Sequence, residues 1–283
     1  MKRRHVWAIA GATAAVVLLA TAVLLNSSKK VTVGQVRSAN ERQPVDAIDH
    51  SAWNRLLGKY VDPQGLVNYA GWKASAEDLA ALDGYLAELS RAEVSERSRT
   101  DGRLAFWTNA FNALCLRGVL RDYPNAPARS PWFWEYHIHR DLLLIVGDKR
   151  YSLNDIHNQL VALNEPLAFL AVDCLYQNGP FLRNSAYLLE TVTAQLAETA
   201  RLHFAQPNRL KADPAKNELS IGPAVELNEG AFGKSLRAAA AALSPYLPDP
   251  ESQRLANSPS TTIRYLPLDG RLNDQSLPQE SNP

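Results

Sequence analysis

The sequence predicts an α+β fold in which helices surround a small, mainly antiparallel sheet, preceded by an N-terminal transmembrane helix. Three observations support this prediction. Several segments have apolar residues at helical spacing, one stretch is typical of a strand, a turn and a second strand, and residues 6–25 carry no charged side chain. The 283 residues are 46% hydrophobic and 21% charged, which suits one globular domain with appendages.

The charge balance argues against one class of partner. The chain has 30 Lys and Arg against 29 Asp and Glu, a formal net charge of +1. Such a chain has no excess of positive charge with which to gather phosphates, so nucleic acid is not an expected partner. No pattern in the sequence indicates a cofactor, and we expect none.

The N-terminus is predicted to be a signal-anchor. As a helix, residues 6–25 would span about 30 Å, the thickness of a bilayer's hydrocarbon core. Basic residues at 2–4 and 29–30 flank this segment and favour leaving a stub of residues 1–5 in the cytoplasm. The alternative is a cleaved signal peptide, because the small residues at 20–22 suit a peptidase.

Either alternative exports the rest of the chain. The predicted location is the inner membrane, single-pass, with the domain in the periplasm or outside the cell. Polar residues 26–45 are predicted to form a flexible tether, residues 46–273 the globular domain, and residues 274–283 a disordered tail. The expected partners are therefore the membrane, through the N-terminal helix, and an unknown ligand or protein of the envelope.

The first half of the domain is predicted to be helical. Residues 51–61 form a helix that Asp49 or Ser51 can cap. Residues 74–90 are amphipathic, because leucines at spacings of three and four share one face. Residues 103–120 are apolar nearly all round, as in a central buried helix.

The second half is predicted to be mixed. Residues 141–152, "DLLLIVGDKRYS", are typical of a strand, a turn and a strand. Residues 152–163 begin another helix, and residues 185–204 form a further one capped near Asn184 or Ser185.

Asn109 and Asn112 interrupt the apolar pattern of the central helix. Being three residues apart, they project from one side, and buried amides must find hydrogen-bond partners. One interpretation is that they brace the backbone of a loop. The other is that they line or orient a binding site.

The chain resembles the DUF547 family, a domain of unknown function common in exported bacterial proteins. The resemblance covers nearly the whole domain and rests on five motifs in suitable order and spacing. These motifs are "DHSAWNRLLGKYVDPQGLVNYAGWKA", "AFWTNAFNAL", "YSLNDIHNQL", "DCLYQNGPFLRNSAY" and "IRYLPLDGRLN".

This chain departs from the family pattern at the residues that would form a site. The resemblance implies a helix with Ile-Glu-His, a strand with His just before an Asn-Cys pair, and a second Cys before Pro-Pro-Leu-Arg. Such residues resemble a thiol-based site, because a thiolate needs a neighbouring imidazole or positive group to lower its pKa. Most of these places hold other residues here, namely His157, Asn158, Phe169, Asp173 and Gly179.

Cys174 keeps its position in the pattern. Asp173 beside it should raise the pKa of the thiol, and Asn158 cannot transfer protons as a histidine does. We therefore expect a non-catalytic binding or scaffolding domain. The alternative is a cysteine-dependent hydrolase or transferase that uses Cys174 with His157. Export also leaves open whether Cys174 pairs with Cys115 or both remain buried thiols.

The stretch "EYHIHRD" is a candidate metal site. In a strand, His137 and His139 would face the same way and could both reach a metal. The alternative is ordinary polar alternation on a strand. A stable site needs a third or fourth ligand, so no metal is expected.

Five residues are the candidate binding residues, and they could engage a ligand or a structural partner. Arg183 is expected to pair with Asp155, with Asp173 or with an anionic ligand. The aromatic residues of 132–136 either pack under a loop or form a groove for a glycan, peptide or lipid. The five candidates are Asn109, Asn112, Asp155, Asp173 and Arg183.

Overall fold

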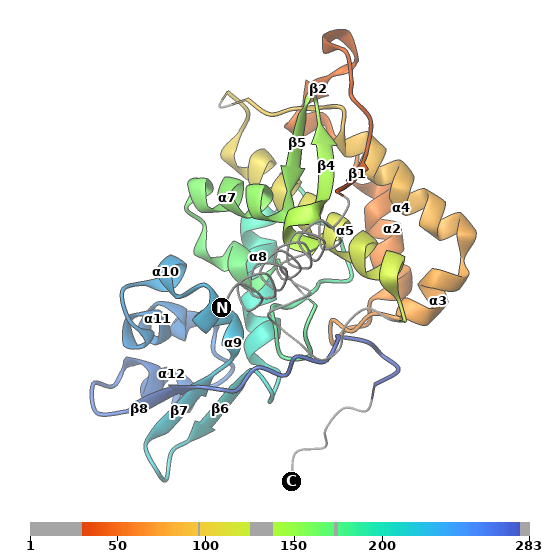
Figure 1. The fold of residues 1–283 in the computed structure, drawn as a ribbon. Coiled ribbons are helices and arrows are strands. Elements are labelled where there is room, and N and C mark those ends of the chain that lie inside the picture. Colours follow the sequence, from red (N-terminus) through yellow and green to blue (C-terminus); the bar gives the residue numbers. More distant parts are fainter. Residues whose placement is uncertain (1–29, 96, 125–137, 173–174, 278–283) are drawn as a thin grey trace, which may run out of the picture. The chain divides into compact units, whose positions relative to one another are not determined.

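The structure is a computed structural model that describes residues 30–95, 97–124, 138–172 and 175–277 (Figure 1). The chain divides into two compact units, Met1–Val31 and Thr32–Pro283. The helices and the site discussed below belong to the second unit.

Three small sheets replace the single sheet expected from the sequence. One has the strand order β1-β4-β5, the second pairs β2 with β3, and the third has the order β6-β7-β8. The hairpin β4–β5 is antiparallel as predicted, but β2–β3 and β7–β8 are parallel. Parallel pairing arises because β8 returns to β7 only after several helices. The strands are β1 (Val31–Val33), β2 (Gln43–Pro44), β3 (Ala92–Glu93), β4 (Leu142–Val146), β5 (Lys149–Ser152), β6 (Leu210–Asp213), β7 (Glu218–Ile221) and β8 (Thr262–Tyr265).

The predicted fold also needs correction at its N-terminus. The expected transmembrane helix, residues 6–25, lies outside the described residues. Over the ranges that the structure describes, no helix has the length and apolar character needed to cross a membrane. The fold is therefore a mixed helix-and-sheet fold with three small sheets, and the location of the domain stays a prediction.

The helices predicted near residues 51–61, 74–90, 103–120 and 152–163 are present, whereas the one predicted at 185–204 begins seven residues later, at Val192. They are α2 (Ser51–Tyr60), α3 (Tyr69–Ala74), α4 (Ala76–Leu89), α5 (Thr100–Asp122), α7 (Leu153–Leu163), α8 (Val192–Phe204), α9 (Pro223–Leu227), α10 (Glu229–Phe232), α11 (Leu236–Leu243) and α12 (Pro250–Asn257). Short 3-10 turns include η3 (Pro166–Leu170).

Helix α5 is the centre of the fold. It is buried on nearly every face and packs against α4, α7 and α8. Figure 1 shows α2, α3 and α4 on one side of α5 and α7 on the other. The strands β6–β8 gather with α9–α12 in a second cluster, which contacts the rest through η3 and α8. This arrangement brings α9 and α10 close to the end of α7.

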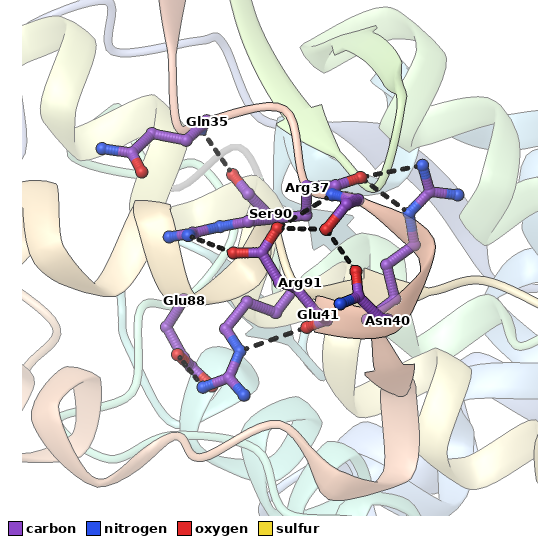
Figure 2. A network of polar contacts seen from close by, with 9 residues as sticks. Gln35, Arg37, Asn40, Glu41, Glu88, Ser90 and Arg91 are labelled. Atoms are coloured by element: carbon purple, nitrogen blue, oxygen red, sulfur yellow. Dashed lines mark hydrogen bonds and ion pairs between the residues drawn. The ribbon is translucent and has the colours of Figure 1, made fainter.

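The segment before α2 is hydrogen-bonded to the rest of the domain at Ser90 (Figure 2). Buried Ser90 Oγ accepts a hydrogen bond from the backbone N–H of Gln35 at 3.1 Å and donates to the carbonyl of Ile145 at 2.8 Å. Gly34 has a φ of +85°, and a Cβ there would lie 2.2 Å from Ser90 Oγ. Glycine is therefore required for this close approach.

The domain extends beyond the boundaries expected from the sequence. Residues 26–45 were predicted to be a tether, yet Gln43 and Pro44 pair with β3 and Val45 is buried. Polar composition did not prevent pairing, because backbone groups pair whatever the side chain. Beyond residue 273, the N–H of Gln275 donates to the carbonyl of Val67 at 3.0 Å.

A buried carboxylate, Asp78, joins α2 to the start of α4. Its oxygens accept hydrogen bonds from Lys59 Nζ at 2.5 Å, Tyr60 OH at 2.7 Å, Ser75 Oγ at 3.0 Å and Arg55 Nη1 at 3.1 Å. The bonds from Lys59 and Tyr60 hold the pKa of Asp78 well below its usual range. The contacts fix the angle between the two helices.

We predict that Asp78→Ala lowers the free energy of unfolding by about 2 kcal/mol, because Tyr60 and Ser75 lose a buried acceptor. Urea unfolding measures this loss. Asp83→Ala is the matched control, since Asp83 lies on the same helix but pairs with Arg117 while 48% exposed. The control should lose about 0.5 kcal/mol or less. Equal losses in the two variants would contradict the role assigned to Asp78.

Two buried histidines make the fold sensitive to acid. His50 Nδ1 is hydrogen-bonded to Tyr85 OH at 2.7 Å, and burial lowers the pKa of His50 to about 4 against the opposing charge of Asp49. Burial, and next the charge of Arg209, place the pKa of His203 well below its ordinary value. The imidazole of His50 therefore stays neutral in the folded protein when the pH falls to 5, and the pKa of His203 is shifted in the same direction.

We predict that stability is full above pH 6.5 and falls as the pH drops towards 4. The unfolded chain takes up protons near pH 6.5, whereas folded His50 does so only near 4, so acid favours the unfolded state. His50 alone should account for about 2 kcal/mol of lost stability at pH 5, and His203 acts in the same direction. Urea unfolding at pH 7.5 and pH 5 measures the effect.

His50→Gln is the control for this prediction, because an amide can still hydrogen-bond to Tyr85 but does not titrate. It should lose less stability than the wild type between the two pH values. The assignment fails if the two proteins lose the same amount.

Candidate functional site

Helix α7 is anchored at its first turn by Asp155. Ser152 donates to Asp155 Oδ2 from its backbone N–H at 2.8 Å and from its hydroxyl at 2.6 Å. The N–H of Asp155 donates back to Ser152 Oγ at 3.1 Å, which completes a capping box. Asp155, a candidate binding residue, is thus engaged in positioning the helix.

His157 lies on the next part of α7 and faces Asn228, between α9 and α10. Its Nε2 is 3.4 Å from Asn228 Oδ1, and its ring centroid is 5.0 Å from that of Phe169. The Nδ2 of Asn228 donates to the carbonyl of Ala224 at 3.0 Å. That bond directs Oδ1 towards the imidazole, so Nε2 is the donor of a long hydrogen bond to it.

Two cavities meet at His157, Leu227 and Asn228, and we call them together the His157 groove. The inner cavity, about 230 Å³, is also lined by residues of the core, of the first turn of α7 and of the helical turn before β4, namely Phe111, His139, Asn154, Val172 and Pro180. The outer cavity, about 390 Å³, is completed by the end of α7, η3 and α10, through Val161, Asn164, Glu165, Pro166, Phe169, Glu229, Gly230 and Ala231.

The groove has an exposed apolar rim. Val161 is 53% and Leu227 55% exposed, and both line the outer cavity. Few large apolar side chains of the described residues are exposed to that degree. Apolar side chains brought together beside a cavity indicate a binding surface, whereas scattered ones do not.

His139 joins His157 in the inner cavity. The alternating histidines His137 and His139 predicted a strand. Residues 138–141 are helical instead, and His137 lies outside the described residues. The structure thus brings together two histidines that were assigned to different sites. Within the described ranges, no group of three or more His, Cys, Asp and Glu could hold a metal ion.

The structure does not describe the cysteine on which the alternative, a cysteine-dependent hydrolase or transferase, depends. Cys174 and Asp173 lie outside the described residues, so their roles, and any pairing of Cys174, stay predictions. The same holds for the aromatic residues of 132–136. Cys115 is buried on α5.

The asparagines of α5 contact backbone. Asn109 Nδ2 donates to the carbonyl of Tyr187 at 2.7 Å, and its Oδ1 accepts from the N–H of Tyr187 at 2.9 Å. Asn112 Nδ2 donates to the carbonyl of Ala171 at 2.8 Å. Neither residue lines the two cavities of the His157 groove. The bonds of Asn109 hold the segment before α8, and the bond of Asn112 holds the end of η3.

Arg183 forms an ion pair with Glu198 at 2.7 Å, from Nη1 to Oε2. Its guanidinium also lies 6.0 Å from the ring centroid of Tyr187. The sequence had suggested Asp155 or Asp173 as the partner. Asp155 caps α7 instead, and Arg183 joins its turn to α8.

A larger cavity, about 510 Å³, lies at the end of the β6–β8 sheet. Several of its polar groups are engaged in holding its own walls. Asn178 Nδ2 donates to the carbonyl of Pro267 at 2.8 Å, and Arg271 Nε donates to Asp269 Oδ1 at 2.9 Å. None of the exposed large apolar side chains of the described residues lines it, which makes it the weaker candidate.

No sequence pattern predicted the second wall of the groove, residues 227–231. The signal for it was weak, since exposed Leu227 and the "NEG" that follows are typical of any loop. His157 and Asn228 are 71 residues apart, so only the fold brings them together.

Comparison with known proteins gives one match. No curated protein and no solved structure is similar enough to the chain to match it. Residues 95–204 match the family described as "Protein of unknown function, DUF547". The matched segment includes α5, α7 with His157, and α8. This match supports the assignment of residues 95–204 to the DUF547 family.

Proposed function

We propose that this domain is a non-catalytic binding module and that the His157 groove takes a small amphipathic ligand. The observation that carries the proposal is the rim of the groove. Val161 and Leu227, both more than half exposed, flank a cavity that also presents His157 and Asn228. Apolar surface beside a few convergent polar groups is the usual character of a small-molecule site.

The size of the groove supports a ligand of modest length. Small-molecule sites usually have volumes of about 300–1,000 Å³, and the outer cavity alone, at about 390 Å³, is within this range. The inner cavity adds the imidazoles of His139 and His157 and the amides of Asn154 and Asn228. A ligand can therefore place an apolar body against the rim and a polar group against the polar side chains that line the groove.

The groove is also held in shape before any ligand binds. The capping box of Ser152 and Asp155 fixes the start of α7, and Asn228 is tied to the carbonyl of Ala224. Groups that are already positioned lose little freedom on binding, which favours affinity.

We predict that N-phenyl-1-naphthylamine, a neutral apolar dye that fluoresces in apolar surroundings, binds the groove. Leu227→Asp and Val161→Asp should weaken its binding at least about tenfold, because a charge replaces the apolar rim. Fluorescence titration measures the affinity. Leu188→Asp is the matched control, since Leu188 is 47% exposed but does not line the groove.

The control should bind the dye as the wild type does. Thermal unfolding of all variants checks that an exposed substitution has not altered the fold. Absence of binding to the wild type, or unchanged binding by Leu227→Asp, would overturn the proposed function.

A further inference from the structure

We infer that the ligand of the His157 groove is an apolar molecule that carries a primary amine in its ammonium form. This inference rests on the proposed function and adds the chemical class of the ligand. It depends on the charges that line the groove and on the hydrogen-bond donors and acceptors there that are not already used within the protein.

The formal charges along the groove are negative. Glu165 and Glu229 line the outer cavity, and no Lys or Arg lines either cavity. A ligand carboxylate or phosphate would therefore enter without a cationic partner and face two carboxylates. An ammonium group gains from the same two charges.

The titration of a neighbour supports this charge distribution. Burial raises the pKa of Tyr265, and the negative charges of Glu229 and Glu226 raise it further. These two glutamates lie on either side of Asn228 in the sequence, so both formal charges near this wall are negative.

His157 adds an acceptor to the groove. Its Nε2 donates to Asn228 Oδ1, which leaves Nδ1 as the ring atom that can accept a hydrogen bond from a ligand. Glu165 likewise keeps acceptor capacity, because the N–H of Leu167 donates to Oε1 at 3.2 Å and no described residue donates to Oε2. A carboxylate has room for several donors.

An alkylammonium ligand satisfies these features together. Its three N–H donors match the acceptors of Glu165, Glu229 and His157, and its chain can cover Leu227 and Val161. A neutral alcohol of the same length would keep the apolar contact without the charge. A carboxylic acid would keep the apolar contact and add repulsion.

The test is displacement of N-phenyl-1-naphthylamine at pH 7 by three ligands of one chain length: octylammonium, 1-octanol and octanoate. We expect octylammonium to displace the dye at a concentration at least about tenfold lower than octanoate does, with octanol between them. The dipeptide amide Leu-Leu-NH₂ is a fourth ligand. Displacement by it at a lower concentration than octylammonium identifies a peptide amino terminus as the source of the amine, and the reverse order identifies an alkylamine.

The charge contribution is tested with Glu165→Gln/Glu229→Gln. This double variant should bind octanol as the wild type does and lose most of the preference for octylammonium. Glu77→Gln/Glu190→Gln is the matched control, because it removes two exposed glutamates that do not line the groove. The control should keep the preference.

The two proposals fail in different ways. If octanol displaces the dye but octylammonium does so no better, or octanoate does so best, the inference about the amine is wrong and the binding function stands. The amine inference is also overturned if the control loses the preference as fully as the groove variant does. If the dye does not bind the groove, the proposed function fails and this inference fails with it.

Discussion

The fold depends on the burial of α5 together with two amide side chains. A helix that is apolar nearly all round can contain an asparagine only if each amide group finds a partner. Asn109 meets this requirement with both bonds to the backbone of Tyr187, and Asn112 bonds to Ala171. The same bonds fix the loops that leave η3 and enter α8, so one constraint in the core positions the segments around the site.

The groove follows from how the neighbours of α5 are held. Helix α7 packs on α5, and its capping box sets where His157 lies. The C-terminal cluster contributes α9 and α10 as the opposite wall, with Asn228 tied to Ala224. Both walls are held by contacts within the protein, and the exposed Val161 and Leu227 are available for binding.

Local patterns predicted part of this structure. The leucine spacing of α4, the apolar run of α5, the β4–β5 hairpin and the start of α7 follow from periodicity, turn and capping rules. The parallel pairing of β7 with β8 and the contact of His157 with Asn228 join distant segments, which no local pattern records. For His139, alternating polarity predicted a strand, whereas residues 138–141 form a helical turn beside Phe111.

A crystal structure of the protein soaked with octylammonium tests the central claim most directly. The account predicts the ligand in the His157 groove, with its nitrogen about 3 Å from a carboxylate oxygen of Glu165 or Glu229 and its chain against Leu227 and Val161. Octylammonium bound only in the larger cavity beside Asp269, with the His157 groove free of ligand, would contradict it.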